Sequence, residues 1–207
     1  MTMITLIVLA AGESRRFPSN KLLFEIKKNV TIIELLLSSI LTSKVDQILV
    51  ILGHEAEAVD KKVQKVNTGI KTVINPQYRQ GGMSSSIRLG VEEALESQAV
   101  LITPADIPFI PSEVINLLID YYLSNSPLLI IPTYQGQKGH PILISSKLFK
   151  HVLKISEERR GLKEIIEMFK EEIKFLPTNY QGILYDIDSV TDILELKAKI
   201  DADYKDR

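Results

Sequence analysis

Apolar and polar positions alternate along the chain in a way that predicts a repeating order of strands and helices. Residues 4–10 are apolar on both faces of an extended segment, which is typical of a strand buried within a sheet. Further apolar runs of similar length have the same character, and a polar break follows each of them. The strands predicted in this part of the chain are residues 4–10, 47–53, 70–75, 99–106 and 128–131.

Helical patterns separate these strands. Thr31 and Glu34 have the spacing of a capping box ahead of the apolar run IIELLLSSIL, which predicts a helix that starts at this point. Ser112 is predicted to be the N-cap of a later helix. Strands that alternate with helices in this way favour a mostly parallel sheet with helices on both faces. The other helices predicted here are residues 55–66, 84–97 and 112–123.

The alternation becomes less regular after Pro132. The run GHPILIS, residues 139–145, still predicts a strand. Loops between the predicted elements are short, so we expect a single domain over residues 1–207. Its expected fold is α/β and Rossmann-like, with a mostly parallel sheet between helices. The remaining predicted elements are helices at residues 147–155, 162–170 and 190–200 and strands at 172–176 and 182–186.

Composition and charge limit the class of protein. The chain has 207 residues, 45% hydrophobic and 25% charged, which is an ordinary balance for one globular domain with a real core. A net charge of −1 provides no overall field for nucleic acid or an anionic membrane, so any anion site must be local. The absence of cysteine excludes thiol catalysis, thiolate metal sites and disulfides. The sequence has no signal-like segment and no apolar run long enough to span a bilayer, so we expect a cytoplasmic protein.

Polar clusters follow several predicted strand ends, where open α/β sheets bind their ligands. The first lies in LAAGESRRFPSNKLL, residues 9–23, where small residues can turn backbone amides toward phosphate oxygens and Arg15 and Lys21 add positive charge. The loop has neither the GK[ST] of a Walker motif nor a GxGxxG fingerprint. A solvated basic turn, with Arg16 as surface charge, is the alternative reading of the same residues. The four clusters are residues 12–21, 75–86, 104–108 and 186–189.

Carboxylates in two of these clusters are candidate metal ligands. Asp106 follows an apolar strand between Pro104 and Pro108, which restrict its backbone. In the run YDIDS, alternation places Asp186 and Asp188 on the same face of an extended segment, so either can reach a shared ion. Oxygen ligands of this kind suit Mg²⁺. The residues alone leave open a turn aspartate at position 106 and an N-cap for the last helix at position 188.

The cluster after the third predicted strand offers further polar groups. The run GGMSSS, residues 81–86, can place backbone donors at a helix N-terminus near an anion, although serines are also ordinary residues of a first helical turn. Asn75 ends the strand, where it can either read a base or ribose edge or simply stop the strand. Of the three histidines, His54 and His151 lie in charged stretches and are expected at the surface.

Five motifs stand in order along nearly the whole chain. They are LAAGESRRFPSNKLL, NPQYRQGGMSSSIRLGV, ITPADIPFI, GQKGHPILI and YDIDSVTDIL. In the same order they resemble the LAAGxSxRMGxxKxLL, N…GMxxSIxxG, PADxP, GxRGHP and DIDTxED motifs of the MobA-like nucleotidyltransferases. That family includes the molybdenum cofactor cytidylyltransferases and guanylyltransferases. The resemblance implies a fold of the nucleotide-diphospho-sugar transferase type.

The resemblance also implies a reaction and a set of site residues. The reaction is a Mg²⁺-dependent transfer of a nucleotide from a nucleoside triphosphate to a phosphorylated acceptor, with release of pyrophosphate. Lys21, Asp106 and Arg15 are then catalytic, and Asp106 and Asp188 hold the metal. Gly139 and His140 are the expected contacts to the acceptor, with His140 also open to a purely structural role. The implied nucleotide-binding residues are Leu9, Ala10, Ala11, Gly12, Asn75, Gly82 and Ser86.

The form of the first loop favours one nucleotide. In the resembled family, guanine-specific members tend to carry LAGG and cytosine-specific members LAAG, and the methyl group of Ala11 narrows the space beside a base. We therefore expect transfer of CMP from CTP to the terminal phosphate of the molybdopterin-bound molybdenum cofactor, with a molybdoenzyme as a further partner. The alternatives are GTP, another phosphorylated acceptor, or a non-catalytic module that binds a nucleotide or delivers a cofactor.

The sequence departs from the family pattern at three places. Phe17-Pro18 stands where Met-Gly is usual, so the tip of the loop is expected to differ. Ser189 replaces the usual Thr of the last motif, which is a conservative change. Lys138 replaces the usual Arg of the GxRGHP motif, and this change is expected to weaken bidentate binding of a substrate phosphate.

Overall fold

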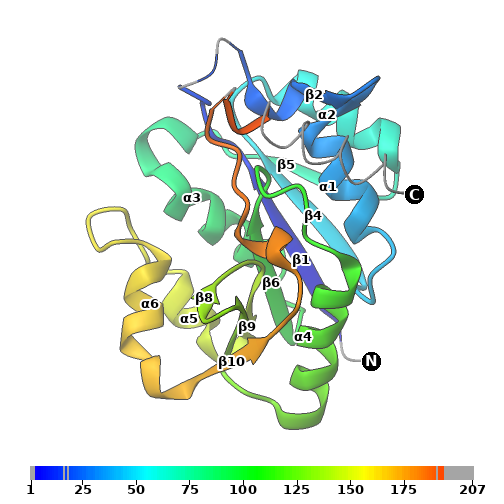
Figure 1. Cartoon of the computed structure of the whole chain (residues 1–207). Coiled ribbons are helices and arrows are strands. Elements are labelled where there is room, and N and C mark those ends of the chain that lie inside the picture. The colour runs from blue at the N-terminus through cyan, green and yellow to red at the C-terminus, as the bar shows by residue number, and fades with distance from the viewer. Residues whose placement is uncertain (1–2, 16, 18, 190, 194–207) are drawn as a thin grey trace.

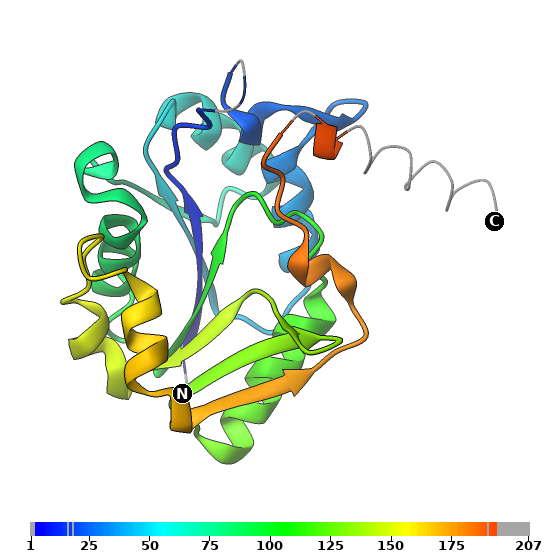
Figure 2. The ribbon, with the colours of Figure 1, turned by 60° about the vertical axis from the view of Figure 1, so that its left-hand side comes forward.

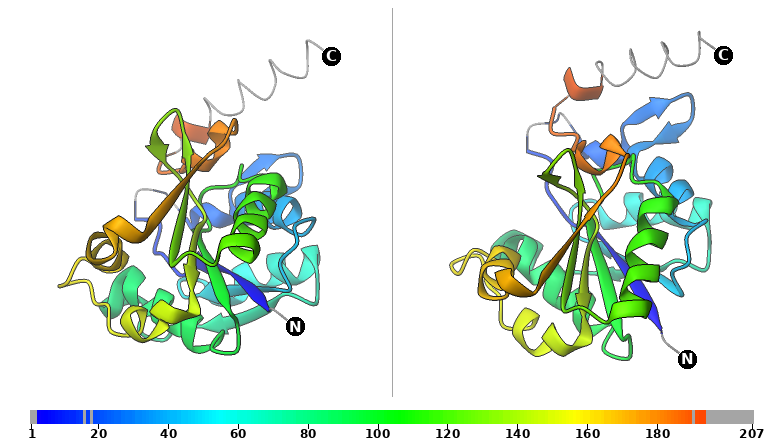
Figure 3. Two further views of the ribbon diagram at one scale, coloured as in Figure 1. Left: turned by 90° about the horizontal axis from the view of Figure 1, so that it is seen from below. Right: turned by 60° about the horizontal axis from the view of Figure 1, so that its bottom comes forward.

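A computed structural model describes residues 3–15, 17, 19–189 and 191–193, and a single large sheet lies at the centre of this part of the chain (Figure 1). The sheet has eight strands among the described residues, and a separate two-stranded hairpin stands apart from it (Figure 3). The hairpin consists of β2 (Glu25–Lys27) and β3 (Val30–Thr31). The strands of the large sheet are β1 (Ile4–Ala10), β4 (Gln47–Leu52), β5 (Lys71–Ile74), β6 (Ala99–Pro104), β7 (Leu129–Tyr134), β8 (Gln137–Lys138), β9 (Ile142–Ser145) and β10 (Ile173–Pro177).

The order of the strands is β10-β7-β9-β6-β1-β4-β5, with β8 paired to β7. Strand β1 is parallel to both of its neighbours, β4 and β6, and the β4–β5 and β7–β10 pairs are also parallel. Strand β9 is antiparallel to β6 and to β7, between which it lies. The predicted α/β fold with a mostly parallel sheet is confirmed, and β9 is the strand of the central order that runs the other way.

Helices cover both faces of the sheet, as the alternation of strands and helices predicted (Figures 1 and 2). The hydrophobic cluster on one face includes side chains of α1, α2 and α4, and the cluster on the other face includes side chains of α3, α5 and α6. No helix in the described part of the chain is both long enough and apolar enough to cross a membrane. The helices are α1 (Ile32–Ile40), α2 (Ala56–Val66), α3 (Tyr78–Glu92), α4 (Ser112–Asn125), α5 (Phe149–Val152) and α6 (Leu162–Met168), with short 3₁₀ turns η1 (Lys21–Leu23), η2 (Ser146–Leu148), η3 (Lys170–Glu172) and η4 (Gln181–Leu184).

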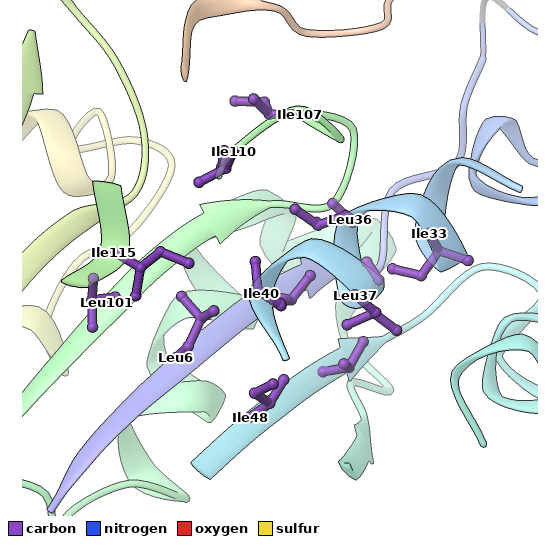
Figure 4. Close-up of a cluster of buried hydrophobic side chains, with 14 of the residues drawn as sticks. Leu6, Ile33, Leu36, Leu37, Ile40, Ile48, Leu101, Ile107, Ile110 and Ile115 are labelled. Atoms are coloured by element: carbon purple, nitrogen blue, oxygen red, sulfur yellow. The ribbon is translucent and has the colours of Figure 1, made fainter. Parts of the chain in front are cut away.

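The apolar strands divide their side chains between these two layers. In β1, Leu6 and Val8 belong to the cluster under α1, whereas Ile7 between them belongs to the cluster under α3. Figure 4 shows Leu37 and Ile40 of α1 above β1 and β4. Both side chains are fully buried. Burial of each such side chain is worth about 1.5–3 kcal/mol, so the core holds β1 firmly beneath its C-terminal loop.

The predicted capping box at the start of α1 is confirmed. The amide and hydroxyl of Thr31 donate to Glu34 Oε2 over 2.8 and 2.7 Å, and Lys65 of α2 donates to Glu34 Oε1 over 2.8 Å. Burial raises the pKa of Glu34, but the hydrogen bonds from Lys65 and Thr31 outweigh this effect and lower the pKa to about 2. This buried carboxylate therefore stays charged near neutral pH and ties α1 to α2.

Some predicted elements differ from the observed ones. The predicted strand at residues 182–186 is wrong, because Gln181–Leu184 forms the turn η4, closed by the Tyr185 amide bonding to the Gly182 carbonyl. Ser112 is not an N-cap, because Pro111 holds that position and the Ser112 hydroxyl donates to the Glu113 carboxylate.

Two predicted helices differ in their bounds from the observed ones. A third predicted helix lies largely outside the residues that the structure describes. Helix α3 begins at Tyr78, six positions before the predicted start at residue 84, and it contains a kink at Gly82. The predicted helix at residues 147–155 is reduced to η2 and α5. The predicted closing helix at residues 190–200 falls outside the described residues except for 191–193, which are helical.

Candidate active site

A cleft of about 490 Å³ lies at the carboxyl ends of β1 and β6. The chain leaves β1 toward β4 on one side and reaches β6 on the other, so the order of the sheet reverses at this point. Open α/β sheets bind ligands at such a reversal. Figure 2 shows that the loop after β1 and the segment after β6 lie at the same end of the sheet. The described residues that line the cleft are Leu9, Ala10, Ala11, Gly12, Glu13, Ser14, Arg15, Phe17, Lys21, Leu22, Tyr78, Arg79, Gly82, Met83, Ser86, Pro104, Asp106 and Asp188.

Local hydrogen bonds fix the backbone that carries Lys21. The buried Asn20 side chain accepts from the Leu22 amide and donates to the His54 carbonyl, each over 3.1 Å. The Lys21 amide donates to the Ser14 hydroxyl over 3.1 Å. The loop therefore presents Lys21 from the short turn η1 at a set position in the cleft.

Lys21 connects three segments that are far apart in the sequence. Its ammonium donates to Asp106 Oδ2 over 2.5 Å and to the Ile187 carbonyl over 2.9 Å. It also lies 3.6 Å from Asp188 Oδ1. The Ile187 amide in turn donates to the Asp106 carbonyl over 2.9 Å. These hydrogen bonds join Ile187 of the C-terminal segment to Lys21 and to Asp106, which follows β6.

Asp106 and Asp188, the acid pair, fit a divalent cation. Both carboxylates approach one positive charge, the Lys21 ammonium, so both can face a shared ion. Among the described residues no group of three or more carboxylate or histidine side chains is placed to hold a metal. The acid pair would therefore share an ion with water and ligand oxygens, which is the usual way in which proteins hold Mg²⁺.

The structure distinguishes the two aspartates of the last motif. Asp188 lines the cleft, whereas Asp186 is absent from the described lining and lies near His140. Hydrogen bonds between Ser189 and Asp192 favour Ser189 over Asp188 as the N-cap of the helical residues that follow. The Ser189 hydroxyl accepts from the Asp192 amide over 3.3 Å, and Asp192 Oδ2 accepts from the Ser189 amide over 2.7 Å.

Most of the expected nucleotide contacts line the cleft together. Leu9, Ala10, Ala11 and Gly12 form one wall, and Gly82 and Ser86 come from α3. Asn75 instead is absent from the described lining and is buried. Its amide donates to the Ser85 and Ser86 hydroxyls over 2.8 and 2.9 Å, and its Oδ1 accepts from the Gln77 amide over 2.9 Å. Asn75 therefore positions Ser86, and its direct contact with a base stays a prediction.

The two expected acceptor contacts lie outside the described lining of the cleft. The His140 amide donates to the Ile183 carbonyl over 3.1 Å, and Gly139 packs against the Ile183 side chain. Burial lowers the pKa of His140, so the imidazole is neutral near neutral pH. Its Nδ1 is buried and has no partner among the described residues. Contact of these residues with an acceptor stays a prediction.

The expected helix N-terminus in GGMSSS exists, and a protein carboxylate occupies it. Gly82 has φ +55° and ψ −153°, which breaks α3 and starts a second helical stretch. The Ser84 amide donates to Glu157 Oε1 over 2.6 Å. A side chain at position 82 would collide with this glutamate. One of the amides expected to face a ligand anion is therefore bonded within the protein.

Sequence reasoning missed three residues of the cleft region. Glu13 and Arg79 line the cleft and form an ion pair over 3.0 Å. Gly53 directly follows β4 beside Ala11, where a Cβ atom would lie 2.7 Å from the Ala11 Cβ. A glycine directly after a buried strand was the available signal for this close approach, whereas no sequence pattern pointed to the ion pair.

Arg15 lies at the rim of the cleft rather than deep within it. Its side chain is 83% exposed and bonds to Glu13. In the signature LAAGxSxRMG, the arginine position corresponds to Arg16, which lies outside the described residues. Arg15 occupies the preceding variable position, and its catalytic role stays a prediction.

This chain is similar to one part of longer curated relatives. It is 26% identical over 222 residues to the bifunctional protein GlmU of Acetivibrio thermocellus, which covers 98% of this chain and 47% of the relative. It is 29% identical over 169 residues to GlmU of Francisella tularensis subsp. novicida, covering 78% of this chain and 36% of the relative. The chain thus spans about half or less of these relatives.

Solved structures share the fold over almost the full chain. Rv0371c of Mycobacterium tuberculosis is 21% identical with a TM-score of 0.78, covering 95% of this chain and 98% of that one. A nucleotidyl transferase of Methanothermobacter has 20% identity and a TM-score of 0.80, covering 95% and 97%. CMP:2-keto-3-deoxy-manno-octonic acid synthetase, solved with CTP, has 12% identity and a TM-score of 0.78, covering 98% and 100%. Rv0371c has also been solved in complex with manganese, with 20% identity to this chain, a TM-score of 0.76 and coverage of 95% and 99%.

The sequence model of one family covers the cleft-lining residues except Asp188. It matches residues 6–173, which include the loop after β1, the Asn75–Ser86 segment and Asp106. This chain belongs to the family of the MobA-like NTP transferase domain.

Proposed function

We propose that this protein is a Mg²⁺-dependent cytidylyltransferase. In the proposed reaction, a terminal phosphate oxygen of the acceptor forms a bond to the α-phosphorus of CTP, and the bond to the β-phosphate oxygen breaks to release pyrophosphate. The observation that carries the proposal is the convergence of Lys21 and the acid pair in a cleft at the reversal point of the sheet. Positive charge and oxygen ligands at one place suit a triphosphate with its metal.

The chain's own residues would act mainly by position and charge. Lys21 would turn from Asp106 toward the triphosphate and neutralise charge that develops as pyrophosphate leaves. A divalent cation held by Asp106 and Asp188 supplies further positive charge to the phosphates. Because the attacking phosphate is already anionic near neutral pH, the reaction requires no general base. A neutral His140 is consistent with that scheme.

The choice of CTP rests on the wall formed by Ala10 and Ala11. Gly53 allows the Ala11 methyl group to pack against the chain directly after β4, and Ala11 lines the cleft. A methyl group there leaves less room beside the base, which favours a pyrimidine. The structural neighbour that holds CTP on the same fold agrees with this choice.

The proposed acceptor is the terminal phosphate of the molybdopterin-bound molybdenum cofactor. This choice follows the resemblance of the five motifs to those of the molybdenum cofactor transferases. A molybdoenzyme would then receive the product. The described residues offer Gly139 and His140 near the cleft-lining segments as the first positions to examine for acceptor contact.

Pyrophosphate release provides the test. The protein is incubated with Mg²⁺ and each of the four nucleoside triphosphates, with and without molybdopterin carrying molybdenum. We expect release with CTP in the presence of this acceptor and none from an Asp106→Asn variant. Release with GTP instead would refute the nucleotide assignment. Release only with another phosphorylated acceptor would refute the acceptor assignment and keep the reaction class.

The second candidate is a module that binds CTP without catalysis and delivers a cofactor. Tight binding of Mg²⁺ and CTP without pyrophosphate release from any acceptor would favour it. The acid pair argues for catalysis, since binding alone does not require two carboxylates facing one cation.

A further inference from the structure

Three charged side chains, the mouth cluster, meet at the entrance of the cleft. Glu13 Oε2 accepts from Arg15 Nε and Nη2 over 2.9 and 2.7 Å, and Glu13 Oε1 lies 3.0 Å from Arg79 Nε. Glu13 and Arg15 belong to the loop after β1, whereas Arg79 belongs to the first turn of α3. All three line the cleft, so the mouth cluster joins its two sides.

The carboxylate in this cluster is unexpected in a loop proposed to face a triphosphate. Alone, it would repel the nucleotide. The hydrogen bond from Arg15 and the charges of both arginines lower the pKa of Glu13, which therefore stays anionic near neutral pH. Two guanidinium groups around one carboxylate leave a net positive charge at the entrance.

The ion pairs of the mouth cluster are weak enough to exchange. The Arg79 side chain is 63% exposed and that of Glu13 is 23% exposed, so water and salt screen their attraction. A triphosphate offers more negative charge and several oxygens in a geometry that a guanidinium can bind with two hydrogen bonds. Arg79 also lies over the Tyr78 ring, 5.5 Å from its centroid, and this contact keeps the guanidinium at the entrance.

We propose that Arg79 is a further triphosphate-binding residue and that Glu13 holds it at the mouth of the cleft until the nucleotide binds. On binding, Arg79 exchanges the Glu13 carboxylate for phosphate oxygens, and Glu13 retains Arg15. This inference rests on the proposed function. Glu13 occupies a variable position of the LAAGxSxR pattern and Arg79 lies between the fixed positions of the N…GMxxSIxxG pattern, so the resemblance implies no role for either residue.

The test compares Arg79→Ala with a matched arginine elsewhere. Arg159 is bonded to Glu164 with side-chain exposures of 60% and 21%, against 63% and 23% for Arg79 and Glu13, and it is absent from the described cleft lining. Arg159→Ala therefore removes the same charge at the same exposure away from the cleft. Isothermal titration with Mg²⁺ measures the affinity of wild type and both variants for CTP, CMP and inorganic tripolyphosphate.

We expect Arg79→Ala to weaken the binding of CTP and tripolyphosphate by about tenfold, the scale of one charge-assisted hydrogen bond, and that of CMP by less than about twofold. Arg159→Ala should bind all three like wild type. Glu13→Gln removes the competing charge, so it should bind CTP at least as tightly as wild type.

Each other outcome is decisive. Unchanged CTP affinity in Arg79→Ala would overturn the inference and leave the proposed function intact. An equal loss for CTP and CMP would overturn it as well, because Arg79 would then act on the base or on the fold. Weaker CTP binding by Glu13→Gln would overturn the proposed exchange, because Glu13 would then be needed in the complex. Wild-type protein that binds none of the four nucleoside triphosphates would refute the proposed function itself.

Discussion

Removing the charge of Lys21 should have two opposite effects, on metal binding and on catalysis. Methionine at position 21 keeps most of the length of the side chain and removes the ammonium. The Asp106 carboxylate then loses its 2.5 Å partner, Asp188 loses the cation 3.6 Å away, and the Ile187 carbonyl loses a donor. A divalent cation that enters the ligand-free cleft no longer has to displace Lys21 from the acid pair.

The structure sets the scale of both effects. A hydrogen bond to a charged group is worth about 1.5–3 kcal/mol, and the Lys21 and Asp106 side chains are only 15% and 21% exposed. If displacement of Lys21 costs about 2 kcal/mol, its removal raises the affinity for a divalent cation about thirtyfold. The same variant lacks a preorganised cation for the leaving pyrophosphate, which costs about 2–4 kcal/mol in kcat/KM.

Mn²⁺ binding to the ligand-free protein is followed by electron paramagnetic resonance, and turnover by pyrophosphate release. Lys21→Arg keeps a cation and serves as the control, for which Mn²⁺ affinity should stay close to that of wild type. If the Lys21→Met variant binds Mn²⁺ no more tightly than wild type does, then Lys21 does not compete with the metal ion for the acid pair. Normal turnover by the same variant would refute its role with the triphosphate.

Three further predictions concern separate residues. Asp188→Ala should abolish Mg²⁺-dependent turnover, while calorimetry finds a melting temperature close to that of wild type, because Ser189 and Asp192 make the cap. Ala11→Gly should reduce the preference for CTP over GTP in titrations with both nucleotides; a wild type that prefers GTP would contradict the steric argument. Glu34→Gln should lower the free energy of unfolding at pH 7 by about 2–3 kcal/mol, since a pKa held at about 2 stabilises the fold above the ordinary value of 4.5. Most of this contribution is lost as the pH falls from 4.5 to 2, so denaturant titrations should show a much smaller difference between the proteins at pH 2 than at pH 7.

Local patterns explain why much of the fold could be predicted. A strand such as β1 is apolar on both faces, and the Thr31–Glu34 box marks the start of α1 within four residues. The place of β9 could not be predicted, because it depends on pairing with β6 and β7 in the opposite direction. Residues 182–186 alternate like a strand, but the chain forms the turn η4 there, and its Ile183 carbonyl accepts from the His140 amide.

The candidate site could also be predicted only in part. Lys21, Asp106 and Asp188 each follow a predicted strand or extended segment, so the topology of an α/β sheet was enough to suggest them. Their mutual arrangement depends on contacts across 85 residues of chain or more, which no local pattern encodes. Arg79 was missed for the same reason, because its importance arises only from a partner on another element.

The position of β9 also bears on how the chain folds during synthesis. Strands β1, β4, β5 and β6 all lie within the first 104 residues, so this half of the sheet can form as soon as that length has left the ribosome. Until Ile142–Ser145 follows, β6 is an edge strand with buried-type apolar residues and unpaired backbone groups, which favours aggregation. A proline in β9 would therefore reduce the yield of soluble protein more than it would reduce the activity of the molecules that fold.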